Sequence, residues 1–138
     1  RLWVDLAALL DDDDELVILG DHLVRRAELS GGPDAAERTR AALTQAAETS
    51  PSAHYRRRRL RTAATLVRVG AHSPEETRLR LALTAGGLPE PALQLEVWDP
   101  EFSLHHPATT DLGYPQARVA LHYDGGHHGA DRQIDRDV

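Results

Sequence analysis

The chain has 138 residues and a net charge of −6, which suits one ordinary domain or two small lobes and excludes a large multidomain protein. Cysteine is absent, which excludes disulfides and thiolate metal sites and leads us to expect a cytoplasmic protein. No apolar run is long enough to cross a membrane, so we expect no membrane partner.

Further absences narrow the chemistry. Methionine is absent, so we expect that Arg1 is not a natural start and that the sequence is a fragment of a longer protein. All 16 basic residues are arginine and asparagine is absent, which excludes mechanisms that need a lysine or an asparagine of this chain. Acidic and basic residues balance in residues 1–72, so the net charge arises entirely in residues 73–138.

Residues 1–72 are predicted to be helical, because apolar residues recur there at helical spacing. The acidic run 11–15 could form a cation site, but we favour a solvated connection whose carboxylates stabilise the start of the next helix. The sequence Ser-Gly-Gly-Pro at residues 30–33 is a strong helix breaker. The predicted helices cover residues 3–10, 16–24, 34–48 and 55–69.

A helix is also predicted to open the second half of the chain. Ser73 at its N-cap and Glu76 three residues later form a capping-box pattern, and the glycines at 86 and 87 end the helix. The buried stripe of this helix is expected to contain Leu79, Ala82 and Leu83.

Three strands follow in the prediction. Leu93, Leu95 and Val97 alternate with polar residues, which predicts a strand to about residue 99. Residues 111–114 and 117–124 flank a Pro-Gln turn and predict a hairpin, after which the chain turns towards a helix that has barely begun at its end. A helix, three strands and a helix start indicate the α/β (α+β) class.

The predicted hairpin brings possible metal ligands together. Asp111 would stand opposite position 120 or 122, and in either register His122 and Asp124 share its face, because side chains two apart on a strand point the same way. Directly opposed Cβ atoms lie ~5 Å apart and diagonal ones ~7 to 8 Å, which suits two ligands of one hydrated cation. The opposite face, with Val119, Leu121 and Tyr123, is expected to pack on helices.

Glu76 has two possible roles. Its side chain starts on the helix face that would meet the sheet, so its carboxylate could join the metal site. The interpretation that we favour is that Glu76 only completes the capping box with Ser73. The two roles are compatible.

Four sequence blocks of the second half stand out: residues 73–81 (SPEETRLRL), 87–91 (GLPEP), 111–115 (DLGYP) and 119–128 (VALHYDGGHH). Together they resemble the actinobacterial proteins with a very-short-patch-repair-like endonuclease domain, an uncharacterised family grouped with the PD-(D/E)XK restriction-endonuclease fold. The resemblance implies a restriction-endonuclease-like αβββα core over residues 73–138, incomplete at its C-terminus, after a small helical lobe over residues 1–72.

The resemblance also implies roles for single residues. Asp111 matches the first metal-binding aspartate of the family, Asp124 the acid two positions after its second acidic site, and Glu76 its first-helix glutamate. His127 and His128 match a histidine pair that would lie near the scissile phosphate. The implied reaction is hydrolysis of phosphodiester bonds in DNA with Mg²⁺ or Mn²⁺ as cofactor.

Position 122 departs from the family, whose members usually have glutamate there. His122 is a poor ligand for Mg²⁺ but an acceptable one for Mn²⁺ or Zn²⁺. Two functions therefore stay open: an active metal-dependent endodeoxyribonuclease with Asp111, Asp124 and His122 as metal ligands, or a catalytically decayed nuclease-fold protein that acts as a nucleic-acid-binding or regulatory module. A transition-metal site that also uses His105 and His106 is a weaker hypothesis.

DNA is the partner that the resemblance implies. Five arginines at residues 56–59 and 61 form a basic cluster that could grip phosphates, although a solvated helix face is slightly favoured. The acidic second half repels DNA unless metal ions or further basic residues compensate. The candidate DNA-binding residues are Arg56, Arg57, Arg61, Arg132 and Arg136.

Overall fold

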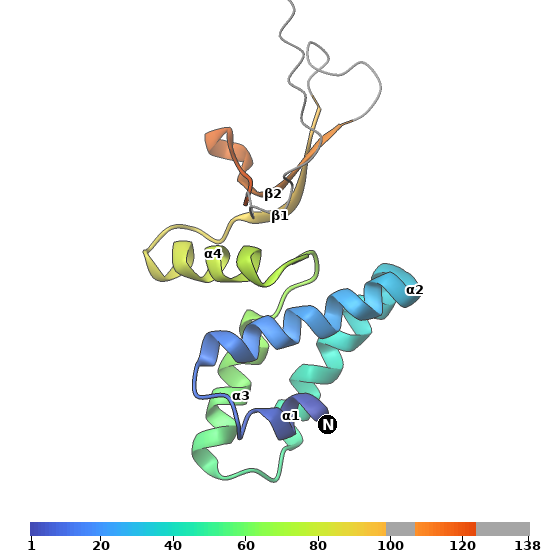
Figure 1. Ribbon diagram of the computed structural model, residues 1–138, viewed down its shortest axis with the longest axis vertical. Helices are drawn as coiled ribbons and strands as arrows, with labels where there is room; N and C mark the ends of the chain where they lie inside the picture. The colour runs from blue at the N-terminus through green and yellow to red at the C-terminus, as the bar shows by residue number, and fades with distance from the viewer. Residues whose placement is uncertain (99–106, 124–138) are drawn as a thin grey trace, which may run out of the picture.

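The computed structural model describes residues 1–98 and 107–123 and has a mixed α+β architecture, as predicted. Figure 1 shows α1, α2 and α3 gathered at one end, the strands at the other, and α4 between them. None of the described helices is long and apolar enough to cross a membrane. The elements are α1 (Leu2–Leu6), α2 (Asp13–Thr49), α3 (His54–Leu66), α4 (Pro74–Ala85), β1 (Ala92–Val97), β2 (Ala108–Tyr114), the 3-10 helix η1 (Pro115–Ala117) and β3 (Val119–Leu121).

The long helix α2 bends sharply at the predicted breaker. Gly32 has φ 75° and ψ −174°, a conformation that glycine adopts without the steric cost that a Cβ would bring. Pro33 follows and restarts the helix, since its missing N–H is not needed in a first turn. Figure 1 shows the resulting two arms of α2, of which the second runs back toward α3.

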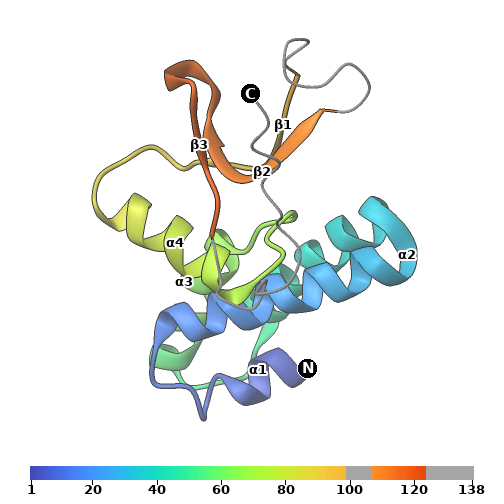
Figure 2. The same ribbon diagram turned by 45° about the horizontal axis from the view of Figure 1, so that its top comes forward.

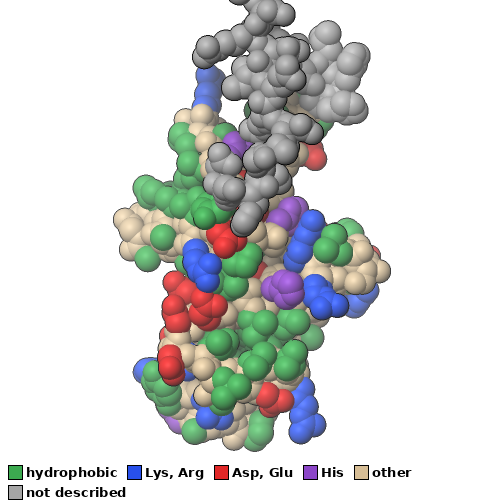
Figure 3. Space-filling model, viewed as in Figure 1, with side chains coloured by type: hydrophobic (Ala, Val, Ile, Leu, Met, Phe, Trp, Pro, Cys, Tyr) green, Lys and Arg blue, Asp and Glu red, His purple; other side chains and the backbone are tan. Residues whose placement is uncertain are grey.

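The acidic run before α2 serves the start of that helix, as the favoured interpretation predicted. The Asp12 side chain caps the helix by accepting a hydrogen bond from the Asp14 backbone N–H, and acidic residues fill the first turn. Two of these acids bind arginines of other helices: Asp13 pairs with Arg59 of α3, and Glu15 pairs with Arg78 of α4. Figure 3 shows the acidic side chains gathered around this start.

The apolar core lies among α1, α2 and α3. Trp3 is 1% exposed and donates its indole N–H to the Leu16 backbone oxygen at 2.8 Å, which satisfies its polar atom inside the core. Leu60 of α3 and Val67 just beyond it are both fully buried. Helix α3 ends at Leu66, earlier than predicted, because Val67 is extended and still fills the core from the connecting segment.

Gly20 marks a close approach between α2 and the segment after α3. A Cβ at this position would lie 2.4 Å from Cγ2 of Val67. Gly20→Ala is therefore expected to lower the free energy of unfolding by about 1 to 3 kcal/mol through overpacking, although alanine favours a helix by ~1 kcal/mol. Urea unfolding followed by circular dichroism measures this. In the double variant with Val67→Ala, the loss in free energy of unfolding should be smaller than the sum of the losses in the two single variants. Strictly additive losses would contradict the contact between Gly20 and Val67.

Helix α4 begins as predicted but buries a different face. The Ser73 hydroxyl accepts the Glu76 N–H and donates to the Glu76 carboxylate, a variant of the predicted capping box in which that carboxylate accepts the His72 N–H and not the Ser73 N–H. The predicted stripe is wrong as a description of the buried face, because Ala82 is exposed and the two leucines are only half-buried. The buried positions after Glu76 are Thr77, Arg80 and Leu81. This face is buried because it meets the carboxylate of Asp21 on α2.

The strands form an antiparallel sheet in the order β1-β2-β3, seen together in Figure 2. The predicted hairpin is confirmed: η1 makes the turn, and Arg118 in the left-handed region (φ 55°) leads into β3. The prediction that the face of Val119, Leu121 and Tyr123 packs on helices is wrong for the described residues. Val119 and Tyr123 are 42% and 49% exposed, and an open groove separates the side chains of Val119 and Leu121 from α4.

Candidate functional site

Asp111 on β2 and His122 after β3 are brought together by the hairpin. The ladder pairs Leu112 with Leu121, so the next facing pair in that register is Asp111 and His122, one of the two registers predicted. The Nδ1 atom of His122 lies 3.8 Å from the Oδ2 atom of Asp111. The same oxygen accepts the backbone N–H of Tyr123 at 2.9 Å, which holds the carboxylate beside the imidazole.

This Asp111–His122 pair can act as part of a metal site. A carboxylate oxygen and an imidazole nitrogen side by side are ligands that Mn²⁺ and Zn²⁺ accept. Both side chains remain open to solvent, with 30% and 63% of their surface exposed, so a hydrated cation could reach them. Within residues 1–98 and 107–123, no three histidine or acidic side chains are grouped closely enough to hold a metal ion. In this arrangement, a third histidine or acidic ligand for the pair would come from outside those ranges.

Several predicted site residues fall outside the described residues, so the structure says nothing of their positions. Asp124 is the next acid along the chain from the Asp111–His122 pair. The others are His105, His106, His127, His128, Arg132 and Arg136.

Glu76 lies at the start of α4, 6% exposed, with both carboxylate oxygens bonded to protein donors. One oxygen accepts the Ser73 hydroxyl at 3.1 Å, and the other accepts the His72 N–H at 3.0 Å and the Gln94 side-chain amide at 3.3 Å. The predicted cap contact between Glu76 and Ser73 is confirmed. A role for Glu76 as a metal ligand stays a prediction, and it would require these bonds to be shared or replaced.

Gln94 is a residue that no sequence pattern singles out. It lies in the middle of β1 with φ 47°, a left-handed conformation that non-glycine residues adopt rarely. The ladder pairs Leu93 with Leu112 and Leu95 with Thr110, so Gln94 stands opposite Asp111. In the sequence, Gln94 looks like an ordinary polar residue of an alternating strand.

The predicted DNA-binding arginines of α3 divide into two groups. Arg61 pairs with Glu48 at 2.6 Å, and the neighbouring Arg59 binds Asp13 and two backbone oxygens, so these two fasten α3 to α2. Arg56 and Arg57 are half-buried, and among the described residues they form no ion pair. Arg56 and Arg57 are therefore the predicted DNA-binding arginines of this helix that no ion pair of the described residues engages.

A buried polar cluster, the Asp21 cluster, joins the helical lobe to α4 and to the segment before β1. The Asp21 carboxylate, 2% exposed, accepts bonds from the Arg68 N–H, the Thr77 hydroxyl and the Arg80 guanidinium at 2.8 to 2.9 Å. Arg80, 1% exposed, and Arg68 both also bind Glu90. Burial raises the pKa of Asp21, and its hydrogen bonds and the charge of Arg80 oppose that rise. The predicted boundary after residue 72 is therefore crossed by a buried ion pair.

Glu90 has the opposite pKa shift. Burial disfavours its charge, but bonds and charges from Arg68 and Arg80 outweigh burial and lower the pKa of Glu90. A lowered pKa stabilises the fold above the unfolded value, near 4.5, and this stability is lost as the pH falls through the folded value. Urea unfolding should show wild type more stable than Glu90→Gln at pH 7, with a difference that shrinks below pH 4.5. A stability difference that stays constant with pH would contradict the lowered pKa of Glu90. The pH dependence that Asp21 contributes is present in both proteins and therefore largely cancels in the comparison.

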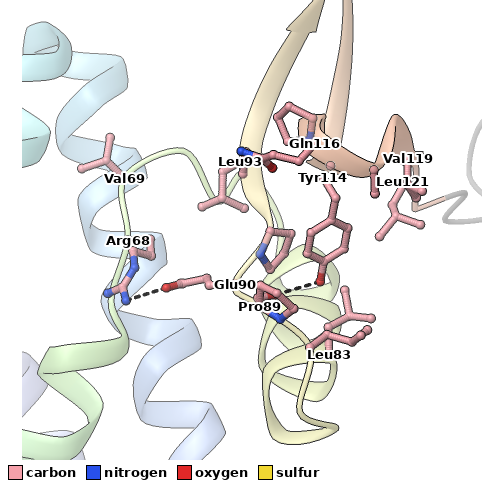
Figure 4. Close-up of a pocket in the computed structure, with 16 residues that line it drawn as sticks. Arg68, Val69, Leu83, Pro89, Glu90, Leu93, Tyr114, Gln116, Val119 and Leu121 are labelled. Carbon is pink, nitrogen blue, oxygen red and sulfur yellow. Dashed lines mark hydrogen bonds and ion pairs between the residues drawn. The ribbon is translucent and has the colours of Figure 1, made fainter.

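An apolar groove of about 970 Å³ separates the sheet from α4 (Figure 4). Leu83 of α4 and Leu93, Val119 and Leu121 of the strands line it. The Tyr114 hydroxyl spans one side by donating to the Pro89 backbone oxygen at 2.9 Å. Asp111 and His122 do not line this groove, so it is separate from the candidate metal site.

No protein-family model, no curated protein and no solved structure matches the chain.

Proposed function

We propose that the chain is a divalent-metal-dependent DNA endonuclease with a restriction-endonuclease-like core, and that Asp111 and His122 supply two of its metal ligands. The observation that carries the proposal is the Asp111–His122 pair, in which the Asp111 Oδ2 atom on β2 and the His122 Nδ1 atom just after β3 lie 3.8 Å apart. Two residues 11 positions apart in the sequence are held together by the register of the hairpin, and both are accessible from solvent.

The order of elements supports the proposed core. A helix, α4, is followed by three antiparallel strands, β1 to β3, and the acidic residue Glu76 stands in the first turn of that helix. These are the elements that the resemblance to the PD-(D/E)XK fold implies for residues 73–121. Asp124 follows β3 within three residues, where it would extend the face of Asp111 and His122.

The residues of the chain have distinct roles in this proposal. Asp111 and His122 hold the cation, with Asp124 as a further ligand, and the Tyr123 N–H keeps the Asp111 carboxylate in place. Such a cation, when bound, polarises the scissile phosphate and lowers the pKa of the attacking water. His127 and His128 would contact the scissile phosphate, and we expect Mn²⁺ to serve better than Mg²⁺, because one ligand is an imidazole.

The charge distribution limits how DNA can bind. Residues 73–138 carry the whole net charge of −6, so this half of the protein repels a phosphate backbone. A bound divalent cation removes part of that repulsion at the site itself. Arg56 and Arg57 of α3 are the described candidates for further phosphate contacts, with Arg132 and Arg136 as candidates beyond β3 and Arg61 engaged by Glu48.

Nicking of supercoiled plasmid by the full chain tests the proposal. We expect conversion to the open circle with MnCl₂, slower conversion with MgCl₂, and none when EDTA is present. Nicking that persists in EDTA would contradict a metal-dependent mechanism. Absence of nicking with every cation, including Zn²⁺, would contradict an active nuclease.

The second candidate, a catalytically decayed nuclease fold that binds nucleic acid or a regulatory partner, is favoured by one observation: the residue opposite Asp111 is histidine and not an acid. His122→Glu distinguishes the two candidates, because a carboxylate there is a ligand that Mg²⁺ prefers. If the wild type is inactive and His122→Glu gains Mg²⁺-dependent nicking, the second candidate is correct. If the wild type already nicks with Mn²⁺, the second candidate is rejected.

A further inference from the structure

Gln94 combines three features that no ordinary strand residue shares. Its φ of 47° lies in the left-handed region, its side chain binds a buried carboxylate, and it stands opposite Asp111 in the sheet. A strained conformation of a non-glycine residue persists only when surrounding contacts hold it. The hydrogen bond from the Gln94 amide to Glu76, at 3.3 Å, is such a contact.

The conformation of Gln94 shapes both strands around the site. The pairs on either side of it, Leu93 with Leu112 and Leu95 with Thr110, are retained, so β2 stays joined to β1 before and after Gln94, although Gln94 and Asp111 themselves are not a pair of the ladder. Figure 1 shows the two strands bending together above α4. Asp111 lies on β2 at this bend, and its carboxylate projects from the backbone that the bend orients.

Glu76 anchors the bend to the helix. Its carboxylate is 6% exposed and is fixed by the Ser73 hydroxyl and the His72 N–H at the start of α4. Gln94 therefore bonds to a group that cannot move without breaking the capping box. A chain of contacts runs from the helix start through Glu76 and Gln94 to the strand segment that carries Asp111.

We infer that Gln94 is a positioning residue: by binding Glu76 it holds β1 in its left-handed bend and thereby sets the position of the Asp111 carboxylate. Its importance for metal binding rests on the proposed function, whereas its effect on Asp111 does not. Gln94 itself does not contact the Asp111–His122 pair through any described hydrogen bond, so it acts through the backbone.

Amide hydrogen exchange of Tyr123 tests the inference without any metal, because that N–H is held by the Asp111 carboxylate at 2.9 Å. Gln94→Gly removes the side chain while glycine still tolerates the positive φ. Gln94→Glu keeps the shape of the side chain but places a second carboxylate beside the carboxylate of Glu76, so the hydrogen bond between them is lost. In both variants the Tyr123 exchange rate should rise about tenfold, the effect of losing one hydrogen bond to a charged group. Gln116→Gly and Gln116→Glu, at an exposed turn position, are matched controls that should leave this rate unchanged.

Two outcomes of the exchange experiment would overturn the inference. The first is an unchanged Tyr123 exchange rate in both Gln94 variants. The second is an equal rise at Tyr123 and at the core amides of α2, which would show a loss of global stability in place of a local loss of position.

Mn²⁺ binding to the full chain, measured by electron paramagnetic resonance of the free ion, connects the inference to the proposed function. If both hold, the Gln94 variants bind Mn²⁺ about tenfold more weakly than wild type, as expected for a partner that orients a ligand from outside the site. If wild type binds no Mn²⁺, the metal site is wrong, and the exchange rates still decide the role of Gln94. If wild type and Gln94 variants bind Mn²⁺ equally, the inference fails and the metal site stands.

Discussion

Asp111→Asn is expected to reduce Mn²⁺-dependent plasmid nicking by at least about 100-fold, because the negative charge that holds the cation is lost and the cation supplies several kcal/mol of transition-state stabilisation. Asparagine has nearly the same shape, and its side-chain oxygen can still accept the Tyr123 N–H that Asp111 accepts now. The variant therefore removes the charge of the ligand while it keeps the end of the hairpin in place. Single-turnover nicking rates at saturating Mn²⁺, with unfolding midpoints for both proteins, measure the effect.

Glu96→Gln provides a matched control for this substitution. Glu96 is an exposed acid on β1 of the same sheet, opposite Thr109, and it takes no part in the Asp111–His122 pair. Its conversion to an amide changes the net charge as much as Asp111→Asn does, so a general effect on DNA repulsion would appear in both. Equal nicking rates for Asp111→Asn and wild type would reject the assignment of the site to Asp111.

Asp21→Ala is expected to lower the free energy of unfolding by about 3 kcal/mol or more, the cost of leaving one partner of a buried ion pair without the other. The guanidinium of Arg80, 1% exposed, would lose its partner at 2.9 Å, and the Thr77 hydroxyl and the Arg68 N–H would lose their acceptor. Glu90 still binds Arg80 in this variant, so we expect the loss in free energy of unfolding to lie at the lower end of the range for broken buried ion pairs. Urea unfolding at pH 7 measures it.

Glu37→Ala is the comparison for this loss. It breaks the exposed pair between Arg40 and Glu37 on α2, whose side chains are 41% and 58% exposed, so it should cost at most about 1 kcal/mol. Asp21→Asn keeps the acceptor oxygen but removes the charge, so its loss should fall between those of Asp21→Ala and Glu37→Ala. Similar losses for Asp21→Ala and Glu37→Ala would show that the Asp21 cluster does not hold the helical lobe to α4.

Local chemistry in the sequence predicted the features that depend on a few adjacent residues. The capping box needs only Ser73 and Glu76 three positions apart, and the bend of α2 needs only Gly32 followed by Pro33. The hairpin follows from two alternating segments around a short turn, and it limits the residue opposite Asp111 to two candidates. In each case the residues that determine the backbone conformation and make the hydrogen bonds are close together in the sequence.

The buried face of α4 could not be predicted in this way. Leucines at helical spacing indicated one face, yet the structure buries Thr77 and Arg80 on another. A buried arginine is unfavourable by itself and becomes acceptable only beside a carboxylate. That carboxylate belongs to Asp21, 59 residues away, and nothing near Arg80 in the sequence announces it.

By itself, the sequence determined the mixed α+β class, the helix starts, the bend of α2 and the presence of an acid and a histidine in one hairpin. Only the tertiary structure decided that His122 is the residue beside Asp111, that Gln94 is left-handed and bound to Glu76, and that polar residues of α4 face inward. The physical reason is the range of the interactions. Caps and turns are satisfied by neighbours in the chain, whereas a buried charge or a strained strand residue needs partners that only folding brings near.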